Sequence, residues 1–427
     1  MPTKLPRRTS ERPKIVSGQS HFGLESVQLE RFKAAFRPDA LPVAPFTAIV
    51  GRNGSGKSTV LEALQWLDVA LRFDTVRASE RYGGVHDLLN IRSRASKRYF
   101  KLILKWAGTQ RGARVQRATY ELRINESSDG RPLVHSEKLD VLDEKNAETP
   151  IIRTEEEGSR STPGRRLLLP LNSDRRRVFD DPDRLALSRL GGGTGDGSQS
   201  NATLEAVRSF WDRAVFLRLS PQRLALGSPP RRKSFEPLLD EEGQSLPALL
   251  NELTDNQKEA LVSAMNSALP DVRKIVVSNP TTSRELNASW SIREKMPTGH
   301  AGRGTYEIPA SMLSEGTRRL TAILALLIRK PAPSLLCIEE IENGLDPWTI
   351  LDVLRRLQTA PRGGTQVILT THSPWLLDSL DVDAIRLVRR TGGNTKYSTF
   401  RSEAAKQRFV ATVPAGAQYV NLPNEGD

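Results

Sequence analysis

The segment Gly51–Ser58, with the sequence GRNGSGKS, carries the clearest chemistry in this chain of 427 residues. It matches the pattern G-x-x-x-x-G-K-[ST], in which glycines let backbone amides converge on the phosphate groups of a nucleoside triphosphate. Lys57 can reach the β and γ phosphates, and the hydroxyl of Ser58 can ligate Mg²⁺. We expect nucleotide contacts along the whole loop, namely from Gly51, Asn53, Gly54, Ser55, Gly56, Lys57, Ser58 and Thr59.

The residues on either side of this segment supply the elements that such a loop needs. Phe46 to Val50 form an apolar run typical of a buried strand, and apolar residues recur at helical spacing from Val60 to Leu71. A phosphate loop joins a strand to a helix because the helix N-terminus carries partial positive charge. The order strand, loop, helix therefore favours a phosphate site over a plain glycine-rich turn.

Two carboxylates and a histidine follow apolar runs much later in the chain. The run SLLCI predicts a buried parallel strand that ends at Glu339 and Glu340, and TQVILTT predicts another that ends at His372. The carboxyl ends of parallel strands meet at the ligand edge of a sheet. Glu339 is then a candidate Mg²⁺ ligand, Glu340 a candidate general base and His372 a candidate γ-phosphate contact. Taken singly, the carboxylates also fit a solvated strand end, and the histidine fits a structural role.

The order of the predicted elements indicates an α/β fold whose mixed, mainly parallel core sheet is assembled from both ends of the chain. The runs YFKLILKWA and ATYELRI predict an antiparallel pair that flanks this sheet, and helices are expected over 246–269. The expected domain plan is a flexible basic tail at 1–20, an N-terminal lobe with the phosphate loop at 21–125, a charged, glycine-rich insertion of weak order at 126–205, a strand and helical lobe at 206–310, and a C-terminal lobe at 311–427.

Composition narrows the class of partner and the compartment. Lys and Arg number 63 against 50 Asp and Glu, and the resulting net charge of +13 favours a polyanionic partner such as nucleic acid. The only cysteine, Cys337, excludes an internal disulfide. The longest apolar run, Leu320–Ile328, has nine residues, whereas a membrane span needs about twenty. We expect a cytoplasmic protein without a membrane segment.

Together these segments resemble the motifs of the ABC-type ATPases. The set comprises the phosphate loop, the segment LSEGT at 313–317, the acidic strand end at 335–340, the turn NGLD at 343–346 and His372. The resemblance implies an ABC-type head that binds ATP and Mg²⁺ and dimerises around ATP, with a helical lobe that carries the LSEGT signature. It implies that Ser314 and Gly316 contact ATP held by a second copy, and that Asp346 belongs to the same nucleotide site.

Two departures from the family's usual spelling accompany this resemblance. The signature has Glu315 and Thr317 where Gly and Gln are usual, and the acidic strand ends Glu-Glu rather than Asp-Glu. Because a carboxylate beside a phosphate in a poorly solvated site is costly, we expect Glu315 to point away from the phosphate.

The spacing of the motifs favours one branch of the family. Lys57 and Ser314 are 257 residues apart, far more than in transporter subunits. From 22 to 390 the chain resembles the RecF, SMC and OLD-like branch of AAA-like (AAA_21-type) ATPases. On that resemblance Gln222 in LRLSPQRL is the glutamine that senses Mg²⁺, with a plain surface glutamine as the equal alternative. Only 55 residues follow His372, too few for the Toprim nuclease domain of OLD-type proteins.

A basic stretch at 92–117 is a candidate contact for nucleic acid. It holds nine Lys or Arg and no acidic residue, and Tyr99, Phe100 and Trp106 lie among them. Basic side chains bind phosphates in a salt-dependent way, and exposed aromatic rings stack on unpaired bases. We expect contacts with the backbone of DNA or RNA here, with a solvated face or a protein partner as alternatives.

Two functions of different class fit these features. The first is an ATP-hydrolysing, DNA-linked sensor or motor that controls a separately encoded effector, a nuclease in the favoured case, in antiphage defence. The second is a RecF-like loading factor for DNA repair, in which hydrolysis times release from DNA. The nature of the neighbouring gene discriminates between them.

Overall fold

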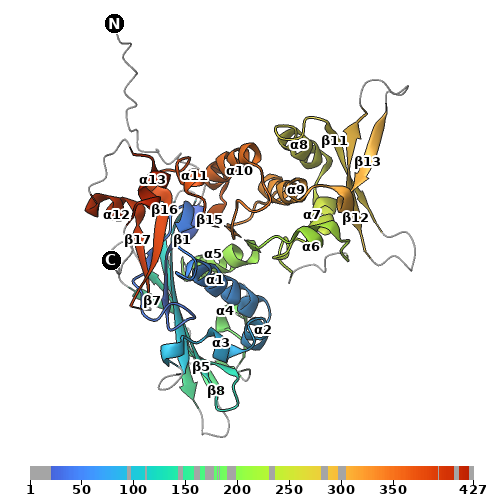
Figure 1. Ribbon diagram of the computed structural model, residues 1–427. Helices are drawn as coiled ribbons and strands as arrows, with labels where there is room; N and C mark the ends of the chain where they lie inside the picture. Colours follow the sequence, from blue (N-terminus) through green and yellow to red (C-terminus); the bar gives the residue numbers. More distant parts are fainter. Residues whose placement is uncertain are drawn as a thin grey trace.

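The computed structural model describes residues 21–93, 98–110, 113–142, 148–157, 164–168, 177–179, 181, 183–189, 199–229, 236–279, 287–296, 304–392, 394–407 and 413–422. Figure 1 shows these segments as three β-sheets with helices between and beside them. The predicted basic tail at 1–20 lies outside the described residues. Within the described ranges, no helix has the length and apolar character needed to cross a bilayer.

The central sheet confirms the predicted mixed, mainly parallel core. Its order is β10 (Ala214–Leu217), β14 (Leu335–Ile338), β15 (Gln366–Thr371), β3 (Phe46–Val50), β16 (Ile385–Thr391) and β17 (Asn394–Thr399). Every neighbouring pair is parallel except β16 and β17, which run antiparallel. Strands from the beginning and the end of the chain are therefore side by side, as the sequence predicts.

Alternate residues of the central strands face two different hydrophobic cores. Leu335 and Cys337 of β14 belong to the core that includes α1 (Lys57–Arg72). Leu336 and Ile338 belong to the core that includes α9 (Glu315–Ile328) and α10 (Pro347–Thr359). Because both faces of each strand are covered, these strands read as continuous apolar runs.

An antiparallel sheet covers the other side of α1. Its order is β2 (Leu41–Pro42), β1 (His21–Glu30), β4 (Tyr99–Gln110), β5 (Ala113–Glu126), β6 (Pro132–Leu142), β7 (Glu148–Glu157), β8 (Gly164–Leu168) and β9 (Arg177–Phe179). The predicted antiparallel pair is confirmed as β4 and β5. Their inward residues pack with α1 and with α5 (Gln199–Asp212).

The expectation of weak order over 126–205 is wrong for part of that range. β6 pairs with β5 and β7, and Val134, Leu139 and Ile152 are fully buried. Charged residues alternate with apolar ones in these strands, so that one face packs while the other face stays polar. The charged residues that indicated a linker therefore lie on the outer face of a sheet. The glycine-rich stretch at 191–198 lies outside the described residues.

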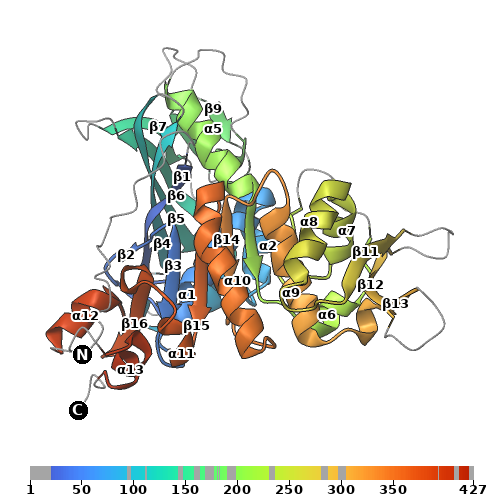
Figure 2. The same cartoon turned by 90° about the horizontal axis from the view of Figure 1, so that it is seen from above.

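The helical lobe contains α6 (Pro221–Ala225), α7 (Leu246–Glu252), α8 (Asp255–Met265) and α9. α7 and α8 confirm the helices expected over 246–269. A three-stranded antiparallel sheet that the sequence did not predict joins them, formed by β11 (Val272–Ser278), β12 (Ser289–Lys295) and β13 (Thr305–Pro309). Figure 2 shows this lobe beside α10, on the side away from α12 (Phe400–Lys406) and α13 (Ala415–Val420). The five domain boundaries stay a prediction.

Candidate functional site

The predicted phosphate loop joins the buried strand β3 to α1. Gly54 and Gly56 have φ angles of 73° and 103°, which glycine adopts without strain. A Cβ on Gly51 would lie 2.2 Å from the carbonyl oxygen of Val388, so no side chain fits there. Gly56 precedes α1 without a side-chain capping bond. The N-terminus of α1 therefore keeps its amides for a ligand, which is the arrangement that binds phosphate.

Lys57 lies inside this loop as a buried cation. Its Nζ donates to the carbonyl oxygens of Gly51 at 2.8 Å and Arg52 at 2.9 Å, and the residue is 6% exposed. Burial lowers the pKa of Lys57 to about 8, and Glu340 and Glu342 oppose that shift. The hydroxyl of Ser55 is buried without a hydrogen-bond partner among the described residues. A buried positive charge and an unsatisfied hydroxyl in one loop fit an anionic ligand.

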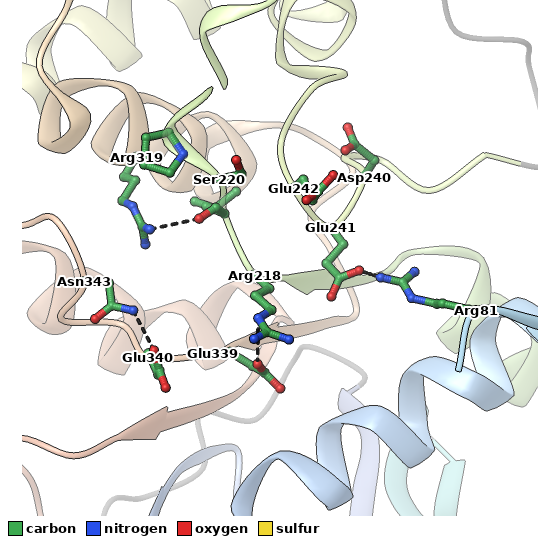
Figure 3. A pocket seen from close by; sticks show the side chains of 12 residues that line it. Arg81, Arg218, Ser220, Asp240, Glu241, Glu242, Arg319, Glu339, Glu340 and Asn343 are labelled. Atoms are coloured by element: carbon green, nitrogen blue, oxygen red, sulfur yellow. Dashed lines mark hydrogen bonds and ion pairs between the residues drawn. The ribbon is translucent and has the colours of Figure 1, made fainter. Parts of the chain in front are cut away.

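Ser58 and Glu339, which sequence reasoning assigned to Mg²⁺, meet in the structure. Burial raises the pKa of Glu339, while the nearby Arg218 guanidinium and Ser58 hydroxyl oppose the rise. The Ser58 hydroxyl therefore faces the Glu339 carboxylate. Arg218 Nε lies 3.6 Å from Glu339 Oε2. Figure 3 marks this ion pair with a dashed line. A hydroxyl and a carboxylate beside the phosphate loop are hard oxygen donors, so this pair fits Mg²⁺.

Gln222 does not join that pair. It lies on α6 with an exposed side chain, and its Oε1 accepts a hydrogen bond from the Ser220 hydroxyl at 3.2 Å. The cavity beside Glu339 is lined by its neighbours Ser220 and Pro221. The metal-sensing role of Gln222 stays a prediction.

Glu340 and His372 are brought together at the carboxyl ends of β14 and β15. Glu340 has a φ of 47°, which is rare and strained for a residue other than glycine. Its amide donates to the Thr370 hydroxyl at 2.9 Å, and Asn343 Nδ2 donates to its Oε2 at 2.6 Å. His372 Nε2 lies 3.8 Å from Glu340 Oε1. Half of the Glu340 side chain is exposed, so water can reach it.

Glu342 is a site residue that sequence reasoning missed. Its Oε1 accepts a hydrogen bond from the His372 amide at 2.6 Å. Its Oε2 is buried and finds no hydrogen-bond partner in the part of the chain that the structure describes. The third acidic residue in IEEIEN is the sequence feature that could have indicated this role. Glu342 fixes the backbone at His372 and adds negative charge facing Lys57.

A polar cavity of about 750 Å³ adjoins these carboxylates (Figure 3). This volume is in the range of small-molecule sites. Arg319 of α9 points into the cavity, where its Nη2 donates to the Leu219 carbonyl at 2.8 Å and its charge attracts Glu340. On the opposite wall Arg81, at the end of α2 (Thr75–Glu80), pairs with Glu241. The cavity is lined by Arg81, Arg218, Leu219, Ser220, Pro221, Asp240, Glu241, Glu242, Arg319, Glu339, Glu340 and Asn343.

The LSEGT segment forms the N-terminus of α9. Ser314 Oγ accepts from the Thr317 amide at 3.1 Å, so Ser314 caps this helix in its own chain. That bond does not use the amides of Glu315 and Gly316. Glu315 pairs with Arg319 of the same helix, with Oε1 3.0 Å from Nε. A Cβ on Gly316 would lie 2.8 Å from the Gly344 carbonyl oxygen, so the signature and the NGLD turn are adjacent.

Asp346 has a structural role that the resemblance did not indicate. Its Oδ1 accepts from the amides of Trp348 and Thr349, both at 3.0 Å, and its Oδ2 accepts from the Thr349 hydroxyl. Asp346 thus caps α10. A nucleotide contact from Asp346, like those from Ser314 and Gly316, stays a prediction.

The aromatic residues of the basic stretch are not available for stacking on bases. Phe100 and Trp106 are fully buried, and Tyr99 donates a hydrogen bond to Glu30. In a strand, alternate residues face opposite sides, and the even positions of β4 face α1. The odd positions place Lys101 and Lys105 outward, next to Arg117 and Arg123 of β5. Of the basic stretch, 94–97 and 111–112 lie outside the described residues.

Phe36 is a second feature of the structure that the sequence did not single out. The ring is half-buried, with the guanidinium groups of Arg31, Arg37 and Arg92 between 5.4 and 5.8 Å from its centre. Phe32, by contrast, is fully buried.

The fold and the site define a P-loop ATPase of the AAA type. The chain belongs to the AAA_21 family, described as "AAA domain, putative AbiEii toxin, Type IV TA system", whose model matches residues 46–378. A segment of 115 residues is 32% identical to the chromosome partition protein Smc of Mycolicibacterium paratuberculosis (strain ATCC BAA-968 / K-10). That match spans 27% of this chain and 8% of the Smc protein.

Solved SMC head structures are also similar to this chain. A SmcHead bound to the C-winged helix domain of ScpA has a TM-score of 0.49 at 17% identity, and the match covers 88% of this chain and 97% of that one. The SMC head domain from Thermotoga maritima has a TM-score of 0.39 at 17% identity, covering 88% and 98%. The Pyrococcus furiosus Smc head, bound to the C-terminal domain of ScpA, has a TM-score of 0.45 at 14% identity, covering 90% and 98%.

Proposed function

We propose that this chain binds ATP with Mg²⁺ at Gly51–Ser58 and hydrolyses it with Glu340 as general base. The observation that carries the proposal is the convergence at one sheet edge of the buried Lys57, the Ser58–Glu339 pair and the Glu340–His372 pair. Mg²⁺ at such a site offsets charge on the phosphate oxygens. Ser58 and Glu339 are the residues that would hold it.

The chain's own groups have distinct roles in this mechanism. The amides at the start of α1 and the Lys57 ammonium bind the phosphates. The half-exposed Glu340 carboxylate accepts a proton from the attacking water. Asn343 fixes one oxygen of that carboxylate, and His372 lies near the other. Glu342 sets the position of His372 through its backbone amide.

The proposal includes a homodimer that closes around ATP. Two large apolar side chains are exposed beside the residues assigned to the second copy, with Met312 at 78% and Trp348 at 81%. Met312 precedes Ser314 by two residues, and Trp348 follows Asp346 by two. Gly316 packs on the Gly344 carbonyl, so the two segments that carry these side chains are adjacent. Exposed apolar residues flanking polar motifs favour burial against a partner chain.

The biological role is the finer part of the proposal. We place the chain in a DNA-linked defence system in which ATP turnover controls a separately encoded effector, a nuclease in the favoured case. The family's description as a putative toxin of a type IV system supports a defence role. The outward Lys105 and Arg117 support contact with the DNA backbone. A RecF-like loading role is the second candidate, favoured by the local similarity to Smc.

Nucleotide binding and phosphate release by the purified full chain test the proposal. We expect ATP binding and Mg²⁺-dependent phosphate release by the wild type, and loss of nucleotide binding in Lys57→Ala. Isolation of the chain from its host then separates the two roles, because a co-purifying nuclease supports effector control and recombination proteins support loading. Phosphate release that persists in Lys57→Ala would assign the activity to a contaminant.

A further inference from the structure

Gly51, the first residue of the phosphate loop, is held by the last described helix of the chain. Its carbonyl oxygen accepts the 2.8 Å hydrogen bond from Lys57 Nζ. Its backbone amide faces the hydroxyl of Tyr419 on α13, and this contact opposes the rise that burial causes in the pKa of Tyr419. Its α-carbon packs against Val388 of β16 so closely that a Cβ there would be 2.2 Å from the Val388 carbonyl oxygen. The two polar backbone groups of Gly51 therefore face Lys57 on one side and Tyr419 on the other.

Thr395 of β17 supports the middle of the same loop. Its Oγ1 lies 3.1 Å from the Ser55 carbonyl oxygen and 3.2 Å from the Ala34 carbonyl oxygen, and it is the donor in these contacts. The residue is 1% exposed. A Cβ on Gly56 would lie 2.7 Å from Thr395 Oγ1. Thr395 thus contacts the loop directly before the amides that open α1.

α13 packs against the segment that follows His372. A Cβ on Gly416 would lie 2.1 Å from the carbonyl oxygen of Pro374, the first residue of α11 (Pro374–Leu377). The Gly416 amide donates to Asp378 Oδ1 at 2.7 Å. Tyr419 can reach Gly51 because this contact fixes the position of α13. The same short helix therefore touches the phosphate loop on one side and the His372 segment on the other.

We propose that Tyr419 and Thr395 are positioning residues for nucleotide binding, and that the chain beyond His372 is the support of the phosphate loop. The inference deepens the proposed ATP-binding function and rests on it. Tyr419 acts through Gly51, whose carbonyl oxygen in turn orients Lys57. A loop held in its binding geometry before the ligand arrives loses less conformational freedom on binding, so its affinity is higher. Neither residue touches the phosphates in this assignment.

Hydroxyl-deletion variants of the full chain provide the test. Tyr419→Phe and Thr395→Val each remove one hydroxyl and keep the shape of the side chain. A matched control is Tyr397→Phe on β17, because the Tyr397 hydroxyl is buried and has no hydrogen-bond partner among the described residues. The equilibrium Kd for ADP, the Kd for a non-hydrolysable ATP analogue and the nucleotide-free melting temperature are measured for each protein.

We expect Tyr419→Phe and Thr395→Val to raise both Kd values by about threefold to tenfold, the range set by one hydrogen bond. Tyr397→Phe keeps both Kd values within about twofold of wild type. A purely structural role for Tyr419 predicts a lower melting temperature with an unchanged Kd. Where ATP turnover is measured, the KM rises and kcat changes less, because the lost contact orients the loop before chemistry.

Gly416→Ala tests the same contact without altering the tyrosine. The added methyl group pushes α13 away from Pro374 and withdraws Tyr419 from Gly51, so Kd rises as in Tyr419→Phe. The double variant Gly416→Ala/Tyr419→Phe is then no weaker in nucleotide binding than Gly416→Ala alone. Gly416→Ala alone still tests the positioning role if Tyr419→Phe or Thr395→Val does not fold.

Two negative outcomes are distinguishable. If the wild type binds nucleotide and Lys57→Ala does not, but Tyr419→Phe, Thr395→Val and Gly416→Ala all keep the wild-type Kd, the positioning role is wrong and the ATP-binding function stands. If the folded wild type binds no nucleotide, both the function and this inference are wrong.

Discussion

His372 Nε2 lies 3.8 Å from one carboxylate oxygen of Glu340, and Asn343 Nδ2 donates to the other at 2.6 Å. Each oxygen of the Glu340 carboxylate therefore has a neighbouring group, and the two groups come from different loops. Its backbone is held in a strained conformation with a φ of 47°, and the Thr370 hydroxyl accepts from its amide. Such over-determination of one side chain is typical of a group that must be aimed at a reacting atom.

The first prediction concerns the orientation of the Glu340 carboxylate. Asn343→Ala should lower kcat for ATP hydrolysis by about tenfold, because Glu340 then samples other orientations. This loss is smaller than the full contribution of a general base, since the carboxylate is still present. The Kd for nucleotide should stay within about twofold, since Asn343 is not assigned to binding. Asn251→Ala on α7 is the control, because Asn251 is exposed and lies in the helical lobe. Equal effects of both substitutions on kcat would contradict the orienting role.

The second prediction follows from the lowered pKa of Lys57. Its pKa is about 8 against an ordinary 10.5, because burial disfavours the charged form and Glu340 and Glu342 only partly offset that. The unfolded chain therefore binds more protons between pH 8 and 10.5, and the Lys57 contribution to the stability of the nucleotide-free protein improves as pH rises through that window.

Nucleotide affinity should change in the opposite direction. ADP needs the charged lysine, so its affinity in buffer without divalent metal should be flat below pH 8 and fall by up to about tenfold per pH unit above it. Calorimetric titration across pH 7 to 10 measures this. Lys57→Arg, which stays charged over that range, should remove the decline even if its affinity is lower. A decline that persists in Lys57→Arg assigns the titration to another group.

The third prediction is that the signature serves a second copy. Lys57→Ala and Ser314→Arg homodimers should each be inactive, but a mixed dimer joins one intact phosphate loop to one intact signature. Random mixing makes about half of the dimers mixed, so about a quarter of wild-type sites should recover, by the two-fold symmetry of the dimer. Differently tagged subunits report the mixing. Trp348→Ser should weaken the ATP-dependent dimer while keeping monomer binding of nucleotide.

Ser314 also caps α9, so its cap must be separated from its role in the dimer. Ser314→Ala removes the capping bond and typically costs about 1 kcal/mol of stability within its own subunit. That loss cannot be complemented by a partner. If mixed dimers form, bind one ATP with wild-type affinity and still show no turnover, while Ser314→Arg alone closes an ATP-dependent dimer, the signature does not act on the partner's phosphate.

The fourth prediction locates the DNA contact on the outer face of β4 and β5. Lys105→Ala/Arg117→Ala should lower DNA affinity and reduce the salt dependence by about one unit of slope per lost phosphate contact. Exposed Arg273 and Lys274 on β11 are a matched control, because replacing both with Ala removes the same charge from the helical lobe. An equal loss of affinity in the control would show that net charge alone matters.

The sequence predicts the central sheet and the first contacts of the site because these depend on local patterns. GRNGSGKS and the apolar runs before Glu339 and His372 sit on elements whose type follows from their own residues. Thr395 and Tyr419 carry no such signal, since Thr395 meets Ser55 across 340 positions of the chain. The sequence does not predict the outer strands for a related reason. A strand with one charged face has the composition of a linker, and only its pairing with neighbouring strands distinguishes the two.

The most direct test of the proposed ATPase is the fate of ATP bound to Glu340→Gln. In a single-turnover experiment with Mg²⁺, the wild type should convert bound ATP to ADP and phosphate. Glu340→Gln should bind ATP with a Kd within about threefold and convert it at least a hundredfold more slowly, since an amide does not accept the proton of the attacking water. Glu342→Gln is the matched control and should retain turnover, because its amide oxygen still accepts the His372 hydrogen bond. Conversion by Glu340→Gln at the wild-type rate would show that Glu340 is not the base.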